Sequence, residues 1–412
     1  MALFRRSRRT VFVVAAVGVL LAVGIVYTVS EGPKVRKPDS LPGSEISLRD
    51  MVFYMAAPSM KGRDEGSEHS AEVRAFLIET MQSCGLEPAG ELGGWEQRIR
   101  TGQGTNVLGR VRGRASLDGP YPLVSAHYDH QDQGLRIHPG AYDNAAAVAS
   151  LLTLACRMAA EPPARDVLIA FWDAEEPPTF LTDAMGSQYY VDNPTVELND
   201  ISTAVVLDLM GAPLWPGFKG GFAVGAETSS ELTAIVKKVH TTGFQPARAG
   251  LHLIEDLVTG RHQPWSDYDA FRNQHIPVLF YSDGQNKRYH TAKDTPEHID
   301  FDRLHLETDW LETLIRAIAD ADRAPTWSPR ELYAQDLDQL RPVLKEAADD
   351  PFFSKTARAS LEVSIDELAD ISKRLDQGAS MSDGDVWILR RATQKLMCWC
   401  QPMGSALTCG LL

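Results

Sequence analysis

Short apolar runs alternate with stretches of helical periodicity through the middle of this chain. The runs that have the length of buried strands are 106–111, 122–126, 167–172, 203–207 and 276–281. Between them, residues 144–158 and 229–239 carry apolar side chains at helical spacing. Strands that are apolar on both faces and alternate with helices predict an α/β fold, with a mixed, mostly parallel twisted sheet and helices on both of its faces.

The pattern changes on either side of this region. After residue 326 it predicts amphipathic helices alone, at 329–348, 354–375 and 382–397. Before it, residues 31–44 contain three prolines and several charges, which is typical of a linker. We therefore divide the chain into four parts: a basic N-terminus with an apolar segment (1–30), the linker (31–44), a main domain (45–325) and a helical extension (326–412).

The apolar segment predicts contact with a lipid bilayer. Residues 11–29 are nineteen residues without a charge, close to the minimum length that spans a membrane. Four arginines lie just before it, so the N-terminus is expected in the cytoplasm and the main domain on the extracytoplasmic side, periplasmic or extracellular. We expect an uncleaved signal anchor. The alternatives are a cleaved signal peptide, which leaves a secreted protein, and a loose match to a twin-arginine export signal.

Composition narrows the range of partners and folds. The formal net charge of −14 argues against nucleic-acid binding, which requires a basic face. The five cysteines are too few to build a fold on disulfides, although three of them gather at residues 398–409. A disulfide there is compatible with an extracytoplasmic location.

Polar residues with metal-binding side chains follow the predicted strands. Ligands of open α/β sheets bind at the carboxyl ends of the strands, so these residues are expected to meet at one edge. Singly, each has a structural explanation, as a hydrogen-bonded histidine or a helix cap. Together they are all histidines or carboxylates, without lysine or arginine. The residues are His127, Asp129, Asp143, Glu175, Glu176, Asp208 and His290.

Two histidines and three carboxylates suit Zn²⁺, with Mn²⁺ or Co²⁺ also compatible. Five ligands are one more than a closed tetrahedral zinc site takes. If one carboxylate bridges two ions, each ion keeps three protein ligands and an open position, which is the arrangement of a co-catalytic metal pair. The sequence therefore predicts two zinc ions per chain.

The order of these residues resembles the M28 family of zinc aminopeptidases over roughly residues 45–325, which would make this part the catalytic domain. The matching motifs are AHYDH (126–130), GAYDN (140–144), AEE (174–176), LDLMG (207–211), SDYDAF (266–271) and YHTAKDT (289–295). The resemblance implies that Asp143 bridges the metals. It also implies that His127 and Asp208 complete one site and that Glu176 and His290 complete the other.

The resemblance further implies that Asp129 fixes the tautomer of His127 and that Glu175 is the general base. Together these roles describe a two-zinc aminopeptidase, in which metal-activated water hydrolyses the peptide or aminoacyl amide bond next to a free N-terminus. Trp265, Tyr268 and Tyr281 are interpreted as core aromatics and not as site residues. The chain departs from the family pattern at residues 144–146 and by an insertion at 177–185, which we expect at the rim of the pocket.

Two other functions compete with this interpretation. A glutaminyl cyclase, an acyltransferase with a single zinc, has a similar motif order, but Asn144 and Tyr289 stand where cyclases usually have serine and tryptophan. A non-catalytic ectodomain on the same fold would be expected to have lost metal ligands, whereas all five ligands and the base are present here.

Overall fold

The computed structural model describes residues 37–38, 47–114, 117, 119–131, 137–256, 260–401, 409 and 412. The predicted membrane segment at 11–29 and most of the predicted linker lie outside these residues. Within the described ranges, no helix has both the length and the apolar character needed to cross a bilayer.

A nine-stranded mixed sheet forms the centre of the described chain, with the order β1-β3-β5-β4-β6-β9-β7-β8 and β2 paired to β3. The central strands β5, β4, β6 and β9 run parallel, while β3 and β7 are antiparallel to their neighbours β5 and β9. The strands are β1 (Glu87–Pro88), β2 (Glu96–Arg98), β3 (Thr105–Val111), β4 (Tyr121–His127), β5 (Val167–Trp172), β6 (Ile201–Leu207), β7 (Phe222–Val224), β8 (Ala247–Ala249) and β9 (Val278–Ser282).

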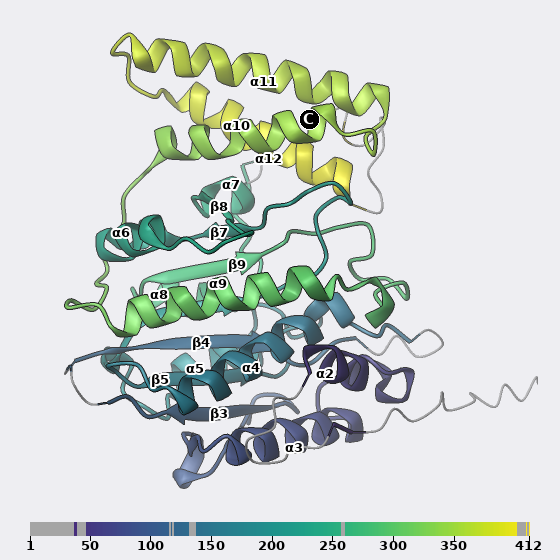
Figure 1. Ribbon diagram of the computed structural model, residues 1–412, viewed down its shortest axis with the longest axis vertical. Coiled ribbons are helices and arrows are strands. Elements are labelled where there is room, and N and C mark those ends of the chain that lie inside the picture. The colour runs from purple at the N-terminus through teal and green to yellow at the C-terminus, as the bar shows by residue number, and fades with distance from the viewer. Residues whose placement is uncertain are drawn as a thin grey trace, which may run out of the picture.

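Helices cover both faces of this sheet, which confirms the predicted fold class (Figure 1). On one face lie α2 (Leu48–Met55), α3 (Glu68–Ser83), α4 (Ala146–Ala160), α6 (Ser230–Lys238) and α9 (Phe301–Ala319). On the other face lie α5 (Gly186–Asp192) and α8 (Tyr268–Asn273). The parallel strands β4, β5 and β6 are buried almost throughout, because both of their faces meet helices.

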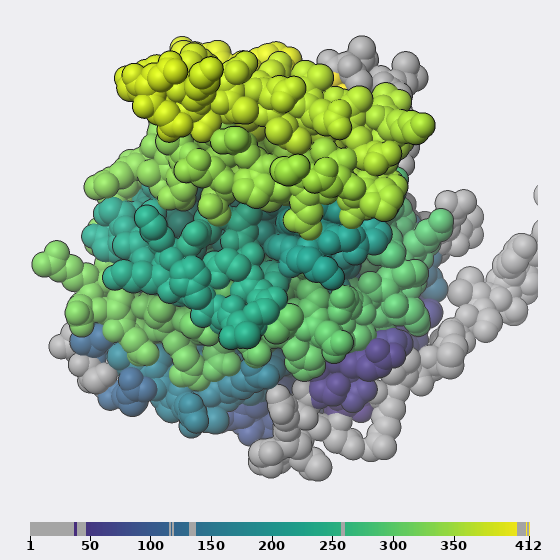
Figure 2. Space-filling view, turned by 45° about the horizontal axis from the view of Figure 1, so that its top comes forward, coloured from purple at the N-terminus to yellow at the C-terminus, as the bar shows by residue number. Residues whose placement is uncertain are grey.

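The C-terminal extension forms three further helices at the β8 end of the molecule, shown in yellow-green to yellow in Figures 1 and 2. They are α10 (Tyr333–Asp349), α11 (Lys355–Asp376) and α12 (Asp383–Cys400), and α10 packs against β8 while α12 packs against α7 (His252–Glu255). Ser354 caps α11, and Ser382 begins α12 with a capping box to Asp385. Their apolar faces share one core with Leu214, Trp215 and Phe218, in the segment after β6.

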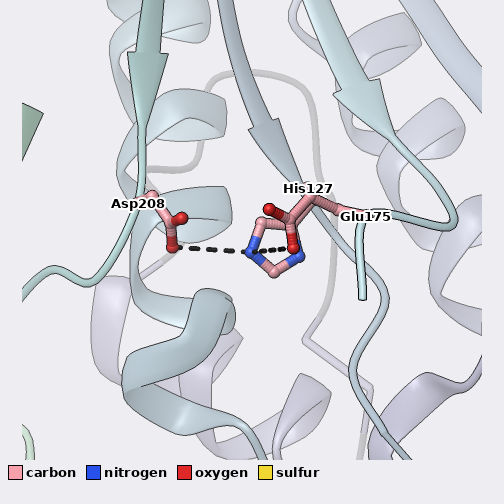
Figure 3. Close-up of side chains that lie close together, drawn as sticks. All are labelled: His127, Glu175 and Asp208. Carbon is pink, nitrogen blue, oxygen red and sulfur yellow. Dashed lines mark ion pairs between the residues drawn. The ribbon is translucent and has the colours of Figure 1, made fainter. Parts of the chain in front are cut away.

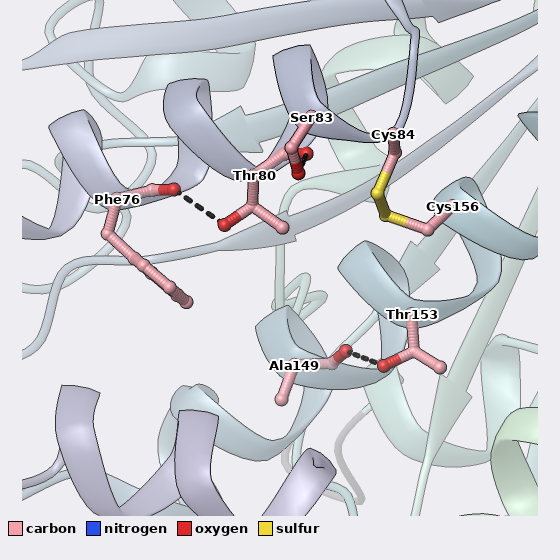
Figure 4. Close-up of a disulfide and its surroundings, with 7 residues drawn as sticks. All are labelled: Phe76, Thr80, Ser83, Cys84, Ala149, Thr153 and Cys156. Atoms are coloured by element: carbon pink, nitrogen blue, oxygen red, sulfur yellow. Dashed lines mark hydrogen bonds between the residues drawn. A yellow bond between two sulfur atoms is a disulfide. The ribbon is translucent and has the colours of Figure 1, made fainter. Parts of the chain in front are cut away.

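Two disulfides join the described cysteines. Cys84, at the end of α3, is bonded to Cys156 in α4, so two helices on the same face of the sheet are linked covalently (Figure 4). Cys398 in α12 is bonded to Cys409, and Cys400 remains a buried free thiol. The sequence had indicated a disulfide among the last three cysteines without fixing the pairing.

Candidate active site

Every residue predicted for the site lies at the carboxyl edge of the parallel strands. His127 ends β4, Asp208 directly follows β6, and the two glutamates follow β5 after a short turn. Asp143 lies in the turn that leads into α4, and His290 lies in the loop after β9. All are buried except His290, whose side chain retains 29% of its accessibility. The strand ends thus bring together residues that are up to 163 positions apart, the span from His127 to His290 (290 − 127 = 163).

Asp143 lies between two groups of side chains. Its Oδ1 is 3.3 Å from Nε2 of His127, and that nitrogen is 3.4 Å from Oδ1 of Asp208. Its Oδ2 is 3.2 Å from Nε2 of His290, and that nitrogen is also 3.2 Å from Oε2 of Glu176. The two oxygens of a single carboxylate therefore face two separate pairs of predicted ligands.

These side chains resemble metal ligands in two ways: several of their buried polar atoms lack a hydrogen-bond partner, and the distances between them are those expected between ligands of one ion. Among the five predicted ligands, all in the described part of the chain, four buried atoms have no hydrogen-bond partner: His127 Nε2, Asp143 Oδ2, Glu176 Oε1 and Asp208 Oδ1. Leaving such atoms unpaired is costly unless a cation satisfies them. Ligands about 2.0–2.1 Å from a tetrahedral zinc lie about 3.3–3.4 Å from one another, close to the four separations of 3.2–3.4 Å around Asp143. The residues therefore fit zinc.

Glu175 lies beside the group formed by His127 and Asp208 (Figure 3). Its Oε2 is 3.8 Å from Nε2 of His127. Burial raises the pKa of the Glu175 carboxyl well above its usual range, and although His127 opposes this shift, the charge of Asp208 adds to it. Glu176 differs, because its burial is outweighed by His130 and His290, which lower its pKa to about 2. The pKa values of the two adjacent glutamates are thus shifted in opposite directions.

Asp129 lies beside His127, for which the sequence gave it a role, and also makes contacts that the sequence did not predict. Its Oδ1 lies 3.5 Å from Nδ1 of His127, whose hydrogen-bond contact, at 3.2 Å, is with the backbone carbonyl of Asp129. The Asp129 carboxylate accepts hydrogen bonds from the backbone amides of Glu175, at 3.2 Å, and Glu176, at 3.0 Å. Asp129 therefore orients the peptide of the glutamate pair as well as lying next to the histidine.

Three further residues of the recognised motifs hold the ligand loops. Asp294 accepts hydrogen bonds from the backbone amides of Tyr142 and Asp143, at 2.7 and 3.0 Å. Asn144 bonds to both the carbonyl of Leu207 and the amide of Leu209, one on each side of Asp208. Ser266 donates to Oδ2 of Asp208 at 2.9 Å. The motifs contained these residues, but spacing alone gave them no role.

Arg63 is a buried residue of the site region that sequence reasoning missed. Its guanidinium donates to the carbonyls of Met55, Tyr128, Pro139 and Gly140 at 2.7–3.0 Å. It thereby ties the loop that follows β4 to the loop that leads to Asp143. Arg63 lies outside every motif of the sequence, and a single arginine before the first strand carries no signal of this position.

Two of the three aromatic residues considered at the pocket, Tyr268 and Tyr281, belong to the core, as interpreted from the sequence, whereas Trp265 is only partly buried. Tyr268 packs against Phe280 and Tyr281 against Trp310, and both tyrosines are fully buried. The inserted segment at 177–185 follows Glu176 directly, with most of its residues at least partly exposed. Its role at the rim of the pocket stays a prediction.

Comparison with known proteins identifies the class of this site. Residues 106–314 match the model of Peptidase family M28, and the chain belongs to that family. It is accordingly a zinc peptidase, a hydrolase that acts on peptide bonds.

Two curated proteins and one solved structure illustrate what the chain is similar to. The chain is 27% identical to the uncharacterized protein YfbL of Escherichia coli over 69% of this chain and 89% of that protein. It is 37% identical to the vacuolar membrane protease of Schizosaccharomyces japonicus, over 24% of this chain and 11% of that protein. The LapA aminopeptidase of Legionella pneumophila shares the fold, with a TM-score of 0.54 and 14% identity over 66% of this chain and 70% of LapA.

Proposed function

We propose that the protein is a co-catalytic two-zinc aminopeptidase that hydrolyses the peptide or aminoacyl amide bond next to a free N-terminus. The observation that carries this proposal is the position of Asp143, whose two oxygens each lie 3.2–3.3 Å from a different histidine. His127 and Asp208 would hold one ion with Asp143, and Glu176 and His290 would hold the other. A bound zinc pair would act as a Lewis acid on the scissile carbonyl.

Glu175 is the residue proposed to move the proton. It takes a proton from the attacking water and returns it to the departing amine, so the same carboxyl acts as base and then as acid. Its raised pKa suits the first half of this cycle, because a carboxylate with a higher pKa is a stronger base toward the attacking water. Asp129 supports the step by fixing the backbone of the glutamate pair.

The requirement for a free amine follows from the resemblance to zinc aminopeptidases and not from the charge of the site. Four carboxylates converge on two histidines there, but two bound zinc ions would carry four positive charges that offset theirs. A comparison of free and N-acetylated substrates therefore tests this requirement.

The test combines metal content with activity. Zinc per chain is counted in the purified protein by elemental analysis, and hydrolysis of aminoacyl-p-nitroanilides is compared with that of their N-acetylated forms. About two zinc ions per chain and cleavage of the free-amine substrates alone support the proposal. Equal rates of hydrolysis for the free and the N-acetylated substrates would contradict the proposal of an aminopeptidase.

The Glu175→Gln variant tests the role of the base. Hydrolysis should be lost in it while zinc is retained, because the amide keeps the size of the side chain but cannot take the proton. Glu227→Gln is a matched control, since Glu227 is a largely buried glutamate that bonds to the amide of Leu251, outside the site.

The same assays separate the competing functions. One zinc per chain together with release of ammonia from a peptide with N-terminal glutamine would assign a glutaminyl cyclase. Absence of bound metal and of both activities would leave a non-catalytic ectodomain.

We also propose that residues 11–29 anchor the protein in a membrane with its catalytic domain on the extracytoplasmic side. The support is the uncharged apolar segment behind four arginines and the two disulfides, which are typical of oxidising compartments. Carbonate extraction of membranes and protease protection test this. A protein that is extracted by carbonate, or that is digested from the cytoplasmic side, would contradict it.

A further inference from the structure

His130 lies next to the predicted metal ligands, although no part of the motif reasoning gave it a role. The side chain is fully buried, and its Nδ1 is 2.5 Å from Oε1 of Glu176 and 3.8 Å from Oδ2 of Asp143. The ligand atoms of His130, Asp143 and Glu176 all lie within 4.8 Å of one another. One imidazole nitrogen thus faces the group that also contains His290.

The contact between His130 and Glu176 does not have the geometry of a hydrogen bond. Both ring nitrogens of His130 and Oε1 of Glu176 are buried without a hydrogen-bond partner among the described residues. Oε2 of Glu176 differs, because it accepts a hydrogen bond from Gln131 at 2.7 Å. A buried nitrogen and a buried oxygen that converge without a shared hydrogen bond can both bind one cation, and their 2.5 Å separation would then widen to about 3.3–3.4 Å, the distance between ligands of one tetrahedral zinc.

The surrounding backbone holds the His130 ring in this position. A Cβ added at Gly140 would lie 2.6 Å from Cγ of the His130 ring, so the ring occupies space that any other residue at position 140 would fill. The ring of His290 meets it edge-on, with the centroids 5.8 Å apart. Gly140 itself has a φ of 60° and is fixed by the hydrogen bond from Arg63 to its carbonyl. The ring therefore has little freedom to turn away from Glu176.

We propose that Nδ1 of His130 is a fourth protein ligand of the ion held by Asp143, Glu176 and His290. This inference rests on the proposed metal pair and goes beyond it, because it makes the two positions unequal. The position with His130 has four protein ligands, as closed zinc sites do, whereas the position with His127, Asp143 and Asp208 has three. The four-ligand position is expected to hold its ion more tightly.

A zinc-loaded crystal structure of the protein tests the inference directly. The expected result is a zinc ion within about 2.2 Å of His130 Nδ1 and of an oxygen of Glu176. Two bound zinc ions with His130 Nδ1 more than about 3 Å from both, donating to Glu176 instead, would overturn the inference and leave the two-zinc aminopeptidase intact. A single zinc in the crystal would overturn the proposed function itself.

Metal affinity in solution provides a second test that does not use activity. In a chelator competition, His130→Gln should lower the affinity for the more tightly bound zinc ion by at least about 100-fold. The affinity for the other ion should change less. His252→Gln is the matched control, because His252 is a partly buried histidine outside the site motifs that pairs with Asp336 of α10. Unchanged affinity of both ions in a folded His130→Gln variant, judged by circular dichroism, would overturn the inference.

Discussion

The carboxylate of Asp129 accepts a hydrogen bond from the backbone amide of Glu176, with the nitrogen 3.0 Å from Oδ2. Its other oxygen accepts from the amide of Glu175 at 3.2 Å. Because both carboxylate oxygens are used as acceptors, an asparagine at this position would place an NH₂ group against a backbone N–H. One of the two hydrogen bonds would then be lost.

We therefore predict that Asp129→Asn lowers both zinc affinity and kcat by about 10–100-fold, as loss of an outer contact to metal ligands does. Chelator competition and steady-state kinetics measure the two effects. Asp349→Asn, at an exposed aspartate that pairs with Lys345, is the control and should match the wild type. A variant with normal kcat and normal zinc affinity would show that these hydrogen bonds are dispensable.

Replacement of Glu175 by glutamine should lower kcat by about 10²–10⁴-fold, the range that general acid–base catalysis contributes. The zinc content should remain that of the wild type, since Glu176 and not Glu175 is the proposed ligand. A Glu175→Gln enzyme that loses zinc in proportion to its activity would instead make Glu175 a ligand.

Arg63→Met should destabilise the protein by about 3–5 kcal/mol, because it removes a buried cation and leaves four backbone carbonyls without their donor. Arg63→Lys should restore little of this loss, since one ammonium group cannot reach all four oxygens in a fork. Urea denaturation measures the free energy of unfolding, and Arg98→Met, at an exposed arginine, is the control. A lysine variant as stable as the wild type would argue against the geometric explanation.

The disulfide between Cys84 and Cys156 should contribute more stability than the one between Cys398 and Cys409. The first joins residues 72 positions apart and the second residues 11 positions apart, so the first restricts the unfolded chain more. The loop-entropy relation gives a difference of about 1.5 kcal/mol in favour of Cys84–Cys156. Unfolding of the two double-alanine variants under identical conditions tests the order, and equal losses would contradict it.

Stability should fall as pH rises because of Glu227. Burial raises the pKa of its carboxyl to about 7, so the folded state holds the proton more tightly than the unfolded state does. The resulting stabilisation is present below the unfolded pKa of 4.5 and is lost as pH rises through 7, in total about 1–3 kcal/mol. Glu227→Gln should flatten the change in unfolding free energy between pH 5 and pH 8, and an unchanged slope would assign it to other groups.

The sequence predicted the parts of the site that depend on local pattern. An apolar run followed by a histidine or carboxylate locates a strand and its carboxyl end, so His127, Asp208 and the glutamate pair were found from the chain alone. The sheet then brings these residues together because neighbouring parallel strands place their carboxyl ends at one edge. Helix-only periodicity after residue 326 likewise identified α10 to α12.

What the sequence did not predict depends on contacts between distant segments. Arg63 donates hydrogen bonds to carbonyls up to 77 positions away. Every residue has a backbone carbonyl, so no residue type in the sequence indicates which ones accept from Arg63. His130 lay inside a recognised motif, but its ring is directed at Glu176 only because Gly140 leaves room for it. The pairing of Cys84 with Cys156 follows from the packing of α3 beside α4, which no cysteine spacing reveals.

The core that α10, α11 and α12 share with Trp215 and Phe218 limits where this protein can be truncated. The indole of Trp215 stacks on Phe218 and donates to Asp350, so the segment after β6 is completed by residues from the end of the chain. That same segment begins at Asp208. A truncated enzyme that ends at α9, or a chimera with another protein's C-terminal region, would leave this segment without its packing partner. The position of Asp208 at the carboxyl edge of the sheet would then be disturbed.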